Sequence, residues 1–444
     1  MLEPSRTTTR AGLDDVVDIC RDLIRIDTSN YASPDGPGER LAAEYVAAKL
    51  ADVGIESRIY EAEKRRSNLV ATLSGRSRPG LLVHGHLDVV PAEKHLWTVD
   101  PFAGEIIDDY LWGRGSIDMK HMVAMILAAV REMKRNGVIP ERDLVLAFLA
   151  DEENDTSLGS RWMVQNHREL FDGCTEAISE VGGYSVQIAP ERRIYMIESG
   201  RKGVAWMRLT AKGKAAHGSI TNTQSALGAL SGAISRIADH EWPLLLTPAS
   251  AQMVSSLQEL TAIDLRERPA LESSVLAPVA GLLTSSLRHV SNPTIFRAGA
   301  SPNVVPGHAE ATVDGRYVFG HQQAFLEEIA ALAGPDISVD LIDLTSGDES
   351  DPRSDLVGQM QEALLSEDAG ASVVPYNSSA STDNASFAEM GIQGYGFAPL
   401  KLPTDYSFSS MFHGVDERVP VEALKFGARV LYRFLCGADP AKPL

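Results

Sequence analysis

The run Leu144–Ala150 constrains the fold most strongly, because all of its residues are apolar (LVLAFLA). Such a run suits a strand that is buried on both faces, as in the centre of a parallel sheet. Helical patterns over 118–135 and 158–171 stand on either side of it, and residues 80–86 are predicted as another strand. This alternation predicts an α/β fold with a mixed, mostly parallel sheet flanked by helices.

The pattern changes near residue 200. Residues 204–210 alternate like a half-buried strand, and the long stretch 242–295 is irregular and rich in Pro, Ser and Leu. Further on, α/β alternation returns and continues to the end of the chain. We therefore expect a split domain of residues 1–200 plus 319–444, with an inserted α+β domain of residues 201–318.

The chain of 444 residues is acidic, with 41 Lys and Arg against 60 Asp and Glu. A net charge of −19 argues against nucleic acid and anionic membranes as partners, since both require a basic surface.

The apolar run 122–130 is far short of the roughly 20 residues that span a bilayer. The segment MLEPSRTTTR has no apolar h-region, so we expect no secretory signal. The residues Cys20, Cys174 and Cys436 form no C-x-x-C pair. We expect a cytoplasmic protein with reduced thiols.

The segment HGHLD places His84, His86 and Asp88 at the end of a predicted strand. Alternate side chains share one face of a strand, so the three would lie together. A histidine followed by a carboxylate suits a metal ligand with the acid that orients it. A solvated His/Asp pair explains this triplet equally well when it is taken alone.

A single aspartate and a run of three acidic residues come next along the chain. Asp118 directly precedes a long helix, where an N-cap is the simpler explanation, but a carboxylate at a sheet edge can also bridge two metal ions. Asp151, Glu152 and Glu153 follow the apolar run. Such acid runs usually lie in solvated loops, but adjacent acids repel one another, so metal cations explain them better after a buried strand. Since neighbouring side chains of an extended chain point opposite ways, one acid can bind metal while the next acts as a base.

Two weaker clusters complete the set. Glu180 ends an apolar strand before a glycine turn (EVGG), and His413 lies in a glycine-containing loop (FHGVDERV). Together with the preceding clusters they supply a set of His, Asp, Glu, Glu and His side chains at the ends of predicted strands or in loops. Mixed nitrogen and oxygen donors of this kind suit two zinc-type ions that keep positions open for water.

The order and spelling of these clusters resemble the M20 family of metallopeptidases, from about residue 15 to residue 435. The resemblance rests on H-x-D-V-V-P, G-R-G-x-x-D-M-K, D-E-E and H-G-x-x-E-R-V, in that order. E-V-G-G and Y-G-F-A-P-L are most similar to the carboxypeptidase S and N-acyl-amino-acid hydrolase branch. The family also contains glutamate carboxypeptidase, succinyl-diaminopimelate desuccinylase and aminoacylase-1. The resemblance implies a zinc-exopeptidase-like catalytic domain with an inserted dimerisation domain.

The resemblance also implies a role for each ligand. Asp118 would bridge two metals. His86 and Glu180 would complete one site, and Glu153 and His413 the other.

Glu152 would be the general base, and Asp88 would support His86. His84 and Asp151 match no ligand position and are expected to be structural neighbours. His121 stands where the family commonly has Gly, so it could contact substrate or crowd the site. The resemblance further implies a cis peptide bond after Asp118.

Three residues of the inserted segment match family positions as well. His217, in G-K-A-A-H-G-S, matches a histidine that serves the partner subunit's active site; without the resemblance it would be a surface turn residue. Asn303, in S-P-N-V-V-P, and Arg316, in V-D-G-R, match positions that contact substrate. Arg316 could hold a carboxylate bidentately, or it could pair with nearby Asp314.

The sequence thus predicts an amidohydrolase or exopeptidase with two divalent metal ions, Zn²⁺ first and Co²⁺ or Mn²⁺ as alternatives. It would cleave small peptides or N-acyl amino acids with a free carboxylate, by a metal-activated water with Glu152 as base. We expect a homodimer through residues 201–318, in which His217 stabilises the oxyanion. Two rivals stay open: an amidohydrolase of the N-carbamoyl or allantoate type, and a non-catalytic metal-binding member, which the presence of Glu152 disfavours.

Overall fold

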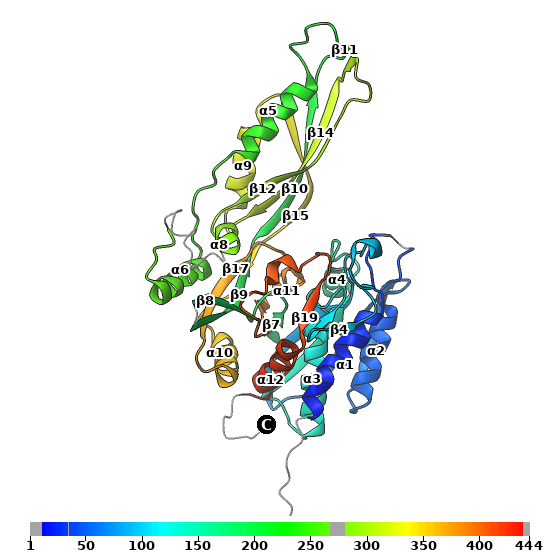
Figure 1. Ribbon diagram of the computed structural model, residues 1–444, viewed down its shortest axis with the longest axis vertical. Coiled ribbons are helices and arrows are strands. Elements are labelled where there is room, and N and C mark those ends of the chain that lie inside the picture. Colours follow the sequence, from blue (N-terminus) through cyan, green and yellow to red (C-terminus); the bar gives the residue numbers. More distant parts are fainter. Residues whose placement is uncertain (1–10, 34, 190, 267–279, 438–444) are drawn as a thin grey trace, which may run out of the picture. The chain divides into compact units, whose positions relative to one another are not determined.

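The computed structural model describes residues 11–33, 35–189, 191–266 and 280–437, which form two compact units (Figure 1). The first unit contains the chain up to Glu198, Asp351–Val374 and the chain from Thr382 onward; the second contains Ser199–Ser350 and Pro375–Ser381. Part of the irregular stretch 242–295 lies outside the described residues. The second unit extends beyond residue 318, where the sequence placed its end.

The first unit is built on a mixed sheet. Its strands are β1 (Ser57–Glu63), β2 (Arg66–Leu73), β6 (Arg142–Leu149), β3 (Ser77–His86), β7 (Cys174–Ser179), β18 (Gln393–Gly396) and β9 (Arg192–Arg201), in this spatial order. Parallel pairing joins the four central strands β6, β3, β7 and β18, while β1, β2 and β9 pair antiparallel. The predicted mixed sheet is confirmed, and its parallel part is the centre, where the apolar run forms most of β6.

Helices cover both faces of this sheet. Leu82 packs in a core with α4 (Ser160–Asn166) and α11 (Asn384–Ala388). Gly85, on the opposite face of β3, contacts α3 (Lys120–Arg135). α3 is buried along almost its whole length, because β3, α1 (Ala11–Arg25) and α12 (Val421–Cys436) surround it. The remaining elements of this unit are α2 (Arg40–Ala51), α10 (Asp355–Glu367), β8 (Tyr184–Ala189), η1 (Lys94–Leu96), η2 (Arg168–Leu170) and η4 (Phe408–Ser410).

A small antiparallel sheet in the first unit joins two distant segments of the chain. Its strands are β4 (Glu105–Ile107), β5 (Tyr110–Trp112) and β19 (Arg418–Pro420). β5 pairs with β4 on one side and with β19 on the other. The residues just before Asp118 are therefore tied to the residues just after His413.

The second unit is an antiparallel sheet with helices on one face. The strands are β12 (Val290–Ala298), β14 (His308–Tyr317), β10 (Gly203–Lys212) and β15 (Ile337–Thr345), in this order. α5 (Ala226–Ala238) and α9 (Gln322–Ala333) cover one face, where Met207 and Leu209 alternate inward with their neighbours. Because α9 and β15 pack here, the unit continues past residue 318. The α+β class predicted for the insertion is confirmed.

The other elements of the second unit are β11 (Ala216–His217), β13 (Val304–Val305), α6 (Pro248–Thr261), α8 (Ala280–Ser286) and β16 (Asp348–Glu349). β17 (Ser372–Ser378) carries the chain between the units. Among the residues described, none of the helices combines the length and apolarity that crossing a bilayer requires.

Candidate metal centre

Five predicted ligands meet at one edge of the first unit's sheet. His86 is the last residue of β3, Glu180 directly follows β7, and Glu153 lies four residues after β6. The carboxyl ends of these parallel strands share an edge, which is where open α/β sheets carry their sites. Asp118 precedes α3, and His413 lies in the loop before β19. The structure therefore brings together residues that the sequence separates widely.

The ligand atoms form two overlapping groups. The first donor group is His86, Asp118 and Glu180, and the second is Asp118, Glu153 and His413; within each, the atoms lie within 4.8 Å of one another. Asp118 presents one oxygen to each group: Oδ1 lies 3.2 Å from Nε2 of His86, and Oδ2 lies 3.3 Å from Nε2 of His413. Glu180 Oε2 is 3.6 Å from the first imidazole, and Glu153 Oε2 is 2.9 Å from the second. The Asp118–Met119 peptide bond is cis, as the resemblance implied.

The orientation of His86 follows from its second nitrogen. Nδ1 lies 2.9 Å from the carbonyl oxygen of Asp88. A carbonyl only accepts, so Nδ1 carries the proton that it donates. Nε2 therefore keeps its lone pair for a metal ion, and it faces the carboxylates of Asp118 and Glu180.

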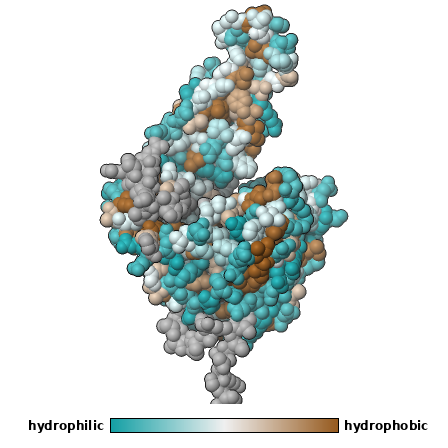
Figure 2. All heavy atoms as spheres, in the orientation of Figure 1, coloured by the Kyte–Doolittle hydropathy of each residue, from teal (hydrophilic) through white to brown (hydrophobic). Residues whose placement is uncertain are grey.

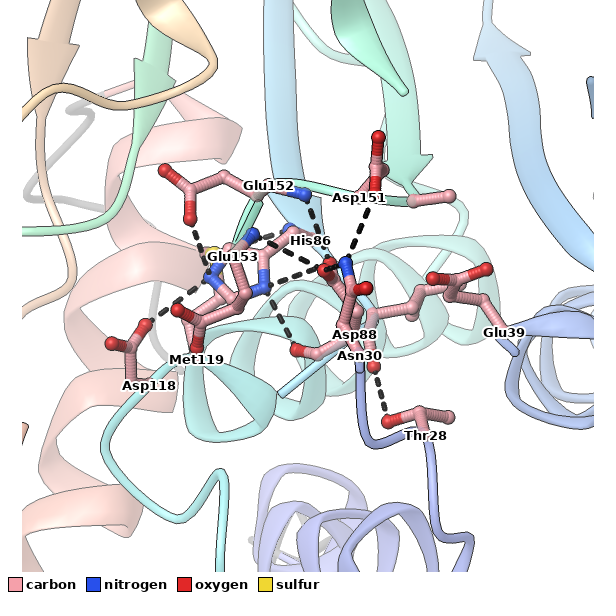
Figure 3. A network of polar contacts seen from close by, with 12 residues as sticks. Thr28, Asn30, Glu39, His86, Asp88, Asp118, Met119, Asp151, Glu152 and Glu153 are labelled. Atoms are coloured by element: carbon pink, nitrogen blue, oxygen red, sulfur yellow. Dashed lines mark hydrogen bonds and ion pairs between the residues drawn. The ribbon is translucent and has the colours of Figure 1, made fainter. Parts of the chain in front are cut away.

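Asp88 is a buried acceptor for several partners at once. Its Oδ1 accepts the backbone N–H of Glu152 (3.2 Å), and Oδ2 accepts the N–H of Glu153 (3.1 Å) and the side-chain amide of Asn30 (2.9 Å). Oδ1 also lies 3.4 Å from Nδ1 of His86. Figure 3 shows these side chains turned toward one another. One carboxylate thus fixes the imidazole and the backbone of the acidic segment.

A further buried chain of polar side chains holds the turn after β6. Asp151 has a left-handed backbone (φ 64°), an uncommon conformation for a residue with a side chain. Its Oδ1 accepts hydrogen bonds from Asn30 Nδ2 (3.0 Å) and Arg66 Nη2 (2.8 Å). Arg66 in turn donates through Nε and Nη2 to both oxygens of Glu39. Asp151 is therefore an anchor of the turn that presents Glu152.

Burial raises the pKa of the three glutamates at this edge. The pKa of Glu152 rises well above its ordinary value, through burial first and then the charge of Glu180. Burial and Asp118 raise the pKa of Glu153 to about 7. Hydrogen bonds to Asp118 and Glu153 raise the pKa of His413 to about 10. Burial opposes the ionised form of Asp118, yet His413 and His86 hold its pKa below the usual range.

The residues present fit a divalent cation. Four carboxyl groups crowd around two imidazoles, and Oε1 of Glu153 is buried without a hydrogen-bond partner in the part of the chain that the structure describes. Buried, uncompensated carboxylates are costly. Carboxylate oxygen and imidazole nitrogen are the donors that Zn²⁺ and similar ions use. A cation in each donor group would offset this charge.

His217 and Asn303 are neighbours in the second unit. His217 ends β11 and is exposed, with Nδ1 2.9 Å from Oγ of Ser219. The N–H of Gly218 donates to the carbonyl oxygen of Asn303 (2.8 Å). The structure thus brings together two of the three predicted residues of the insertion.

Arg316, the third, pairs with Asp314. Its Nε donates to Oδ1 (2.7 Å) and its Nη2 to Oδ2 (3.0 Å). Both residues lie on β14 two positions apart, so their side chains share a face. This is the arrangement that the sequence offered as the alternative to binding a substrate carboxylate.

His84, predicted to be structural, and His121, predicted to contact substrate or crowd the site, are both buried in the first unit. Nε2 of His84 lies 2.8 Å from Oδ1 of Asn384, and its ring packs against Phe387, so it belongs to the core. His121 is buried in the first turn of α3, and burial lowers its pKa to about 4. Neither of its ring nitrogens has a hydrogen-bond partner among the residues described.

The sequence interpretation missed four buried polar residues near the site: Asn30, Arg66, Asp383 and Glu417. Burial raises the pKa of Asp383 to about 7. Its position in S-T-D-N, before α11, would have been found by the same reasoning that found Asp118. Glu417 stands in the H-G-x-x-E-R-V motif and was given no role. No local pattern marks Asn30 or Arg66.

Comparison with known proteins gives the family. Residues 82–436 match the model described as Peptidase family M20/M25/M40. The chain is 26% identical to the N-fatty-acyl-amino acid synthase/hydrolase PM20D1 of Xenopus tropicalis, over 80% of this chain and 71% of that protein. It is 28% identical to the probable carboxypeptidase S-like 2 of Dictyostelium discoideum (78% and 69%) and 26% identical to the aminoacylase-1 of Sus scrofa (92% and 92%).

Solved structures show the same fold. The M20 family metallo-carboxypeptidase Sso-CP2 from Sulfolobus solfataricus superposes with a TM-score of 0.72 at 17% identity, covering 95% of this chain and 98% of that one. The dipeptidase Dug1p from Saccharomyces cerevisiae gives 0.70 at 14% identity (96% and 98%). Human carnosine dipeptidase 1 gives 0.69 at 14% identity (96% and 96%).

Proposed function

Because the chain belongs to peptidase family M20/M25/M40, we propose that it hydrolyses the amide bond of N-acyl amino acids or small peptides that carry a free carboxylate. The observation that carries the proposal is the arrangement around Asp118: two donor groups share this residue, and Glu152 stands beside them in neither group. The relatives point to the substrate class, since PM20D1 and aminoacylase-1 are named for acyl amino acids and carboxypeptidase S-like 2 for peptides.

The two donor groups would hold two divalent ions. His86 and Glu180 would bind one and Glu153 and His413 the other, with Asp118 between them; Zn²⁺ suits these donors best, and Co²⁺ or Mn²⁺ are alternatives. Such ions, when bound, polarise a carbonyl group and lower the pKa of water.

Glu152 is suited to be the base. Its Oε2 lies 3.8 Å from Nε2 of His86, and Asp88 holds its backbone N–H. Burial and Glu180 raise its pKa, so its carboxylate takes up a proton more readily than that of an exposed glutamate. Glu152 would accept a proton from the attacking water and pass it to the amide nitrogen as the C–N bond breaks. The products are a carboxylic acid and a free amine.

The insertion would complete the site from a second subunit. We propose a homodimer through residues 201–318, in which the partner subunit's His217 stabilises the oxyanion. Supporting this, β12, an edge strand of the second unit's sheet within residues 201–318, exposes two large apolar side chains, Ile295 and Phe296. Figure 2 shows hydrophobic residues, in brown, on the surface of this unit beside hydrophilic and intermediate ones. Unpaired apolar edges favour association with another chain.

Asn303 and Arg316 are proposed to contact substrate. Since Arg316 already pairs bidentately with Asp314, a substrate carboxylate would have to replace this partner or join it. The amidohydrolase of the N-carbamoyl or allantoate type remains the second candidate, on the same residues.

A hydrolysis screen tests the proposal. The protein, reconstituted with Zn²⁺, Co²⁺ or Mn²⁺, would be offered dipeptides, N-acetyl and long-chain N-acyl amino acids, their carboxamide forms, N-carbamoyl amino acids and allantoate. We expect hydrolysis of acyl amino acids or dipeptides, and a large loss when the carboxylate is amidated. Turnover confined to N-carbamoyl compounds or allantoate would favour the second candidate, and no turnover with any metal would contradict both.

A further inference from the structure

We propose that Glu417 is a positioning residue, which holds Asp118 and His413 at a fixed distance from each other. It thereby sets the affinity of the second donor group for its metal, an inference that rests on the proposed function. The two ligands come from segments almost 300 residues apart in the sequence. Contacts within the folded protein must therefore hold Asp118 and His413 at a fixed distance from each other. The buried side chain of Glu417 joins these segments directly.

The carboxylate of Glu417 is fully occupied by the loop that leads to Asp118. Oε1 accepts the backbone N–H groups of Ile117 (2.6 Å) and Asp118 (3.1 Å). Oε2 accepts the N–H of Gly115 (3.0 Å) and Nη1 of Arg114 (2.8 Å). Four donors match the acceptor capacity of one carboxylate. The loop therefore takes its shape around this group.

The other end of Glu417 belongs to the segment of His413. The carbonyl oxygen of Glu417 accepts the N–H of Gly113 (2.9 Å), and β19 begins at the next residue and pairs with β5. Nη2 of Arg114 reaches the carbonyl oxygen of His413 (3.5 Å). Residues 112–118 and 413–420 thus form one hydrogen-bonded block.

The block supplies two of the three ligands in the second donor group but only Asp118 of the first. His86 and Glu180 come from β3 and β7, and none of the hydrogen bonds described for Glu417 involves them. A disturbance at Glu417 should therefore weaken the second donor group more than the first.

Glu417→Gln is the sharpest substitution, because it keeps the size and removes one acceptor. The amide NH₂ would face N–H donors on one side, so two of the four partners would lose their bonds. Partners that orient metal ligands are worth about 10–100-fold in metal affinity. Glu367→Gln is the matched control: Glu367 accepts hydrogen bonds from Nε of Arg429 and of Arg433, which join α10 to α12, and neither partner is a proposed ligand.

The experiment titrates metal-free full-length protein with Co²⁺, following heat and the visible spectrum of the bound ion. We expect wild type and Glu367→Gln to bind two ions alike. Glu417→Gln should weaken one of the two binding steps about 10–100-fold, with an altered spectrum for that step, and leave the other step nearly unchanged. Unchanged affinities and spectra in folded Glu417→Gln would overturn the inference, as would equal weakening of both steps.

A second variant covers the case in which Glu417→Gln does not fold. Arg114→Lys keeps the charge but withdraws the planar donor shared between Glu417 and His413. It should weaken the same step in the same direction, and two unchanged steps would overturn the inference. Wild-type protein that binds only one Co²⁺ would instead contradict the proposed function, and the role of Glu417 would fall with it.

Discussion

Replacing Arg66 by methionine should destabilise the first unit and release the turn that presents Glu152. The guanidinium makes four buried hydrogen bonds, three to Glu39 and one to Asp151. Its side chain is 10% exposed, against 1% for Glu39 and 0% for Asp151. Breaking a buried pair leaves an unpaired charge and costs about 3–5 kcal/mol. At about 2 °C per kcal/mol, the unfolding temperature should fall by at least about 6 °C.

The loss should depend on pH. Burial and the charge of Asp88 raise the pKa of Glu39 to about 7, above its ordinary value of 4.5. A carboxyl whose pKa is raised on folding favours the folded state at low pH, and this contribution disappears as the pH rises from about 4.5 through about 7. The hydrogen bonds and charge of Arg66 lower this pKa, so without Arg66 the folded-state pKa of Glu39 rises further. Arg66→Met should therefore lose more stability at pH 8 than at pH 5.

Thermal unfolding at both pH values tests this. The matched control is Arg76→Met, which removes an exposed ion pair with Glu141 and should cost less than about 1 kcal/mol. The double variant Arg66→Met/Glu39→Met should regain part of the loss, because one unpaired charge is gone. The reasoning would be refuted if Arg66→Met unfolded within about 2 °C of wild type at pH 8, or lost more stability at pH 5.

Three further outcomes are expected. Glu152→Gln should lower kcat by about 10²–10⁴-fold with unchanged metal content by elemental analysis, and wild-type turnover would contradict its role as base. Chelation should abolish activity, and Zn²⁺, Co²⁺ or Mn²⁺ should restore it; full activity in verified metal-free protein would exclude the metal mechanism. Mixing inactive His217→Ala with inactive Glu152→Ala protein should recover about a quarter of wild-type activity, since about half the dimers would be mixed, each with one intact site. No recovery after demonstrated subunit exchange would contradict a role for His217 across the dimer.

The sequence was sufficient for the features that depend on local pattern. The apolar run predicted β6 as a central strand, and strand ends located His86, Glu153 and Glu180, because side-chain alternation and strand burial are properties of a few consecutive residues. The mixed α/β fold followed from the alternation of such segments. The same reasoning would have reached Asp383.

The tertiary structure decided what depends on residues distant in the chain. Arg66 contacts both Glu39 and Asp151, and Glu417 contacts the loop before Asp118, although no spacing in the sequence predicts these contacts. The second unit continues past residue 318 because α9 and β15 add to its sheet and core, which only their packing reveals.

Arg316 illustrates the same division at one residue. The sequence offered a substrate carboxylate or Asp314 as its partner with equal weight, and the structure places it on Asp314. An amino-acid pattern specifies which groups a side chain is able to bind. Which of them it does bind depends on the geometry and burial that the whole fold imposes, because the strength of an ion pair or hydrogen bond is set by distance, alignment and the exclusion of water.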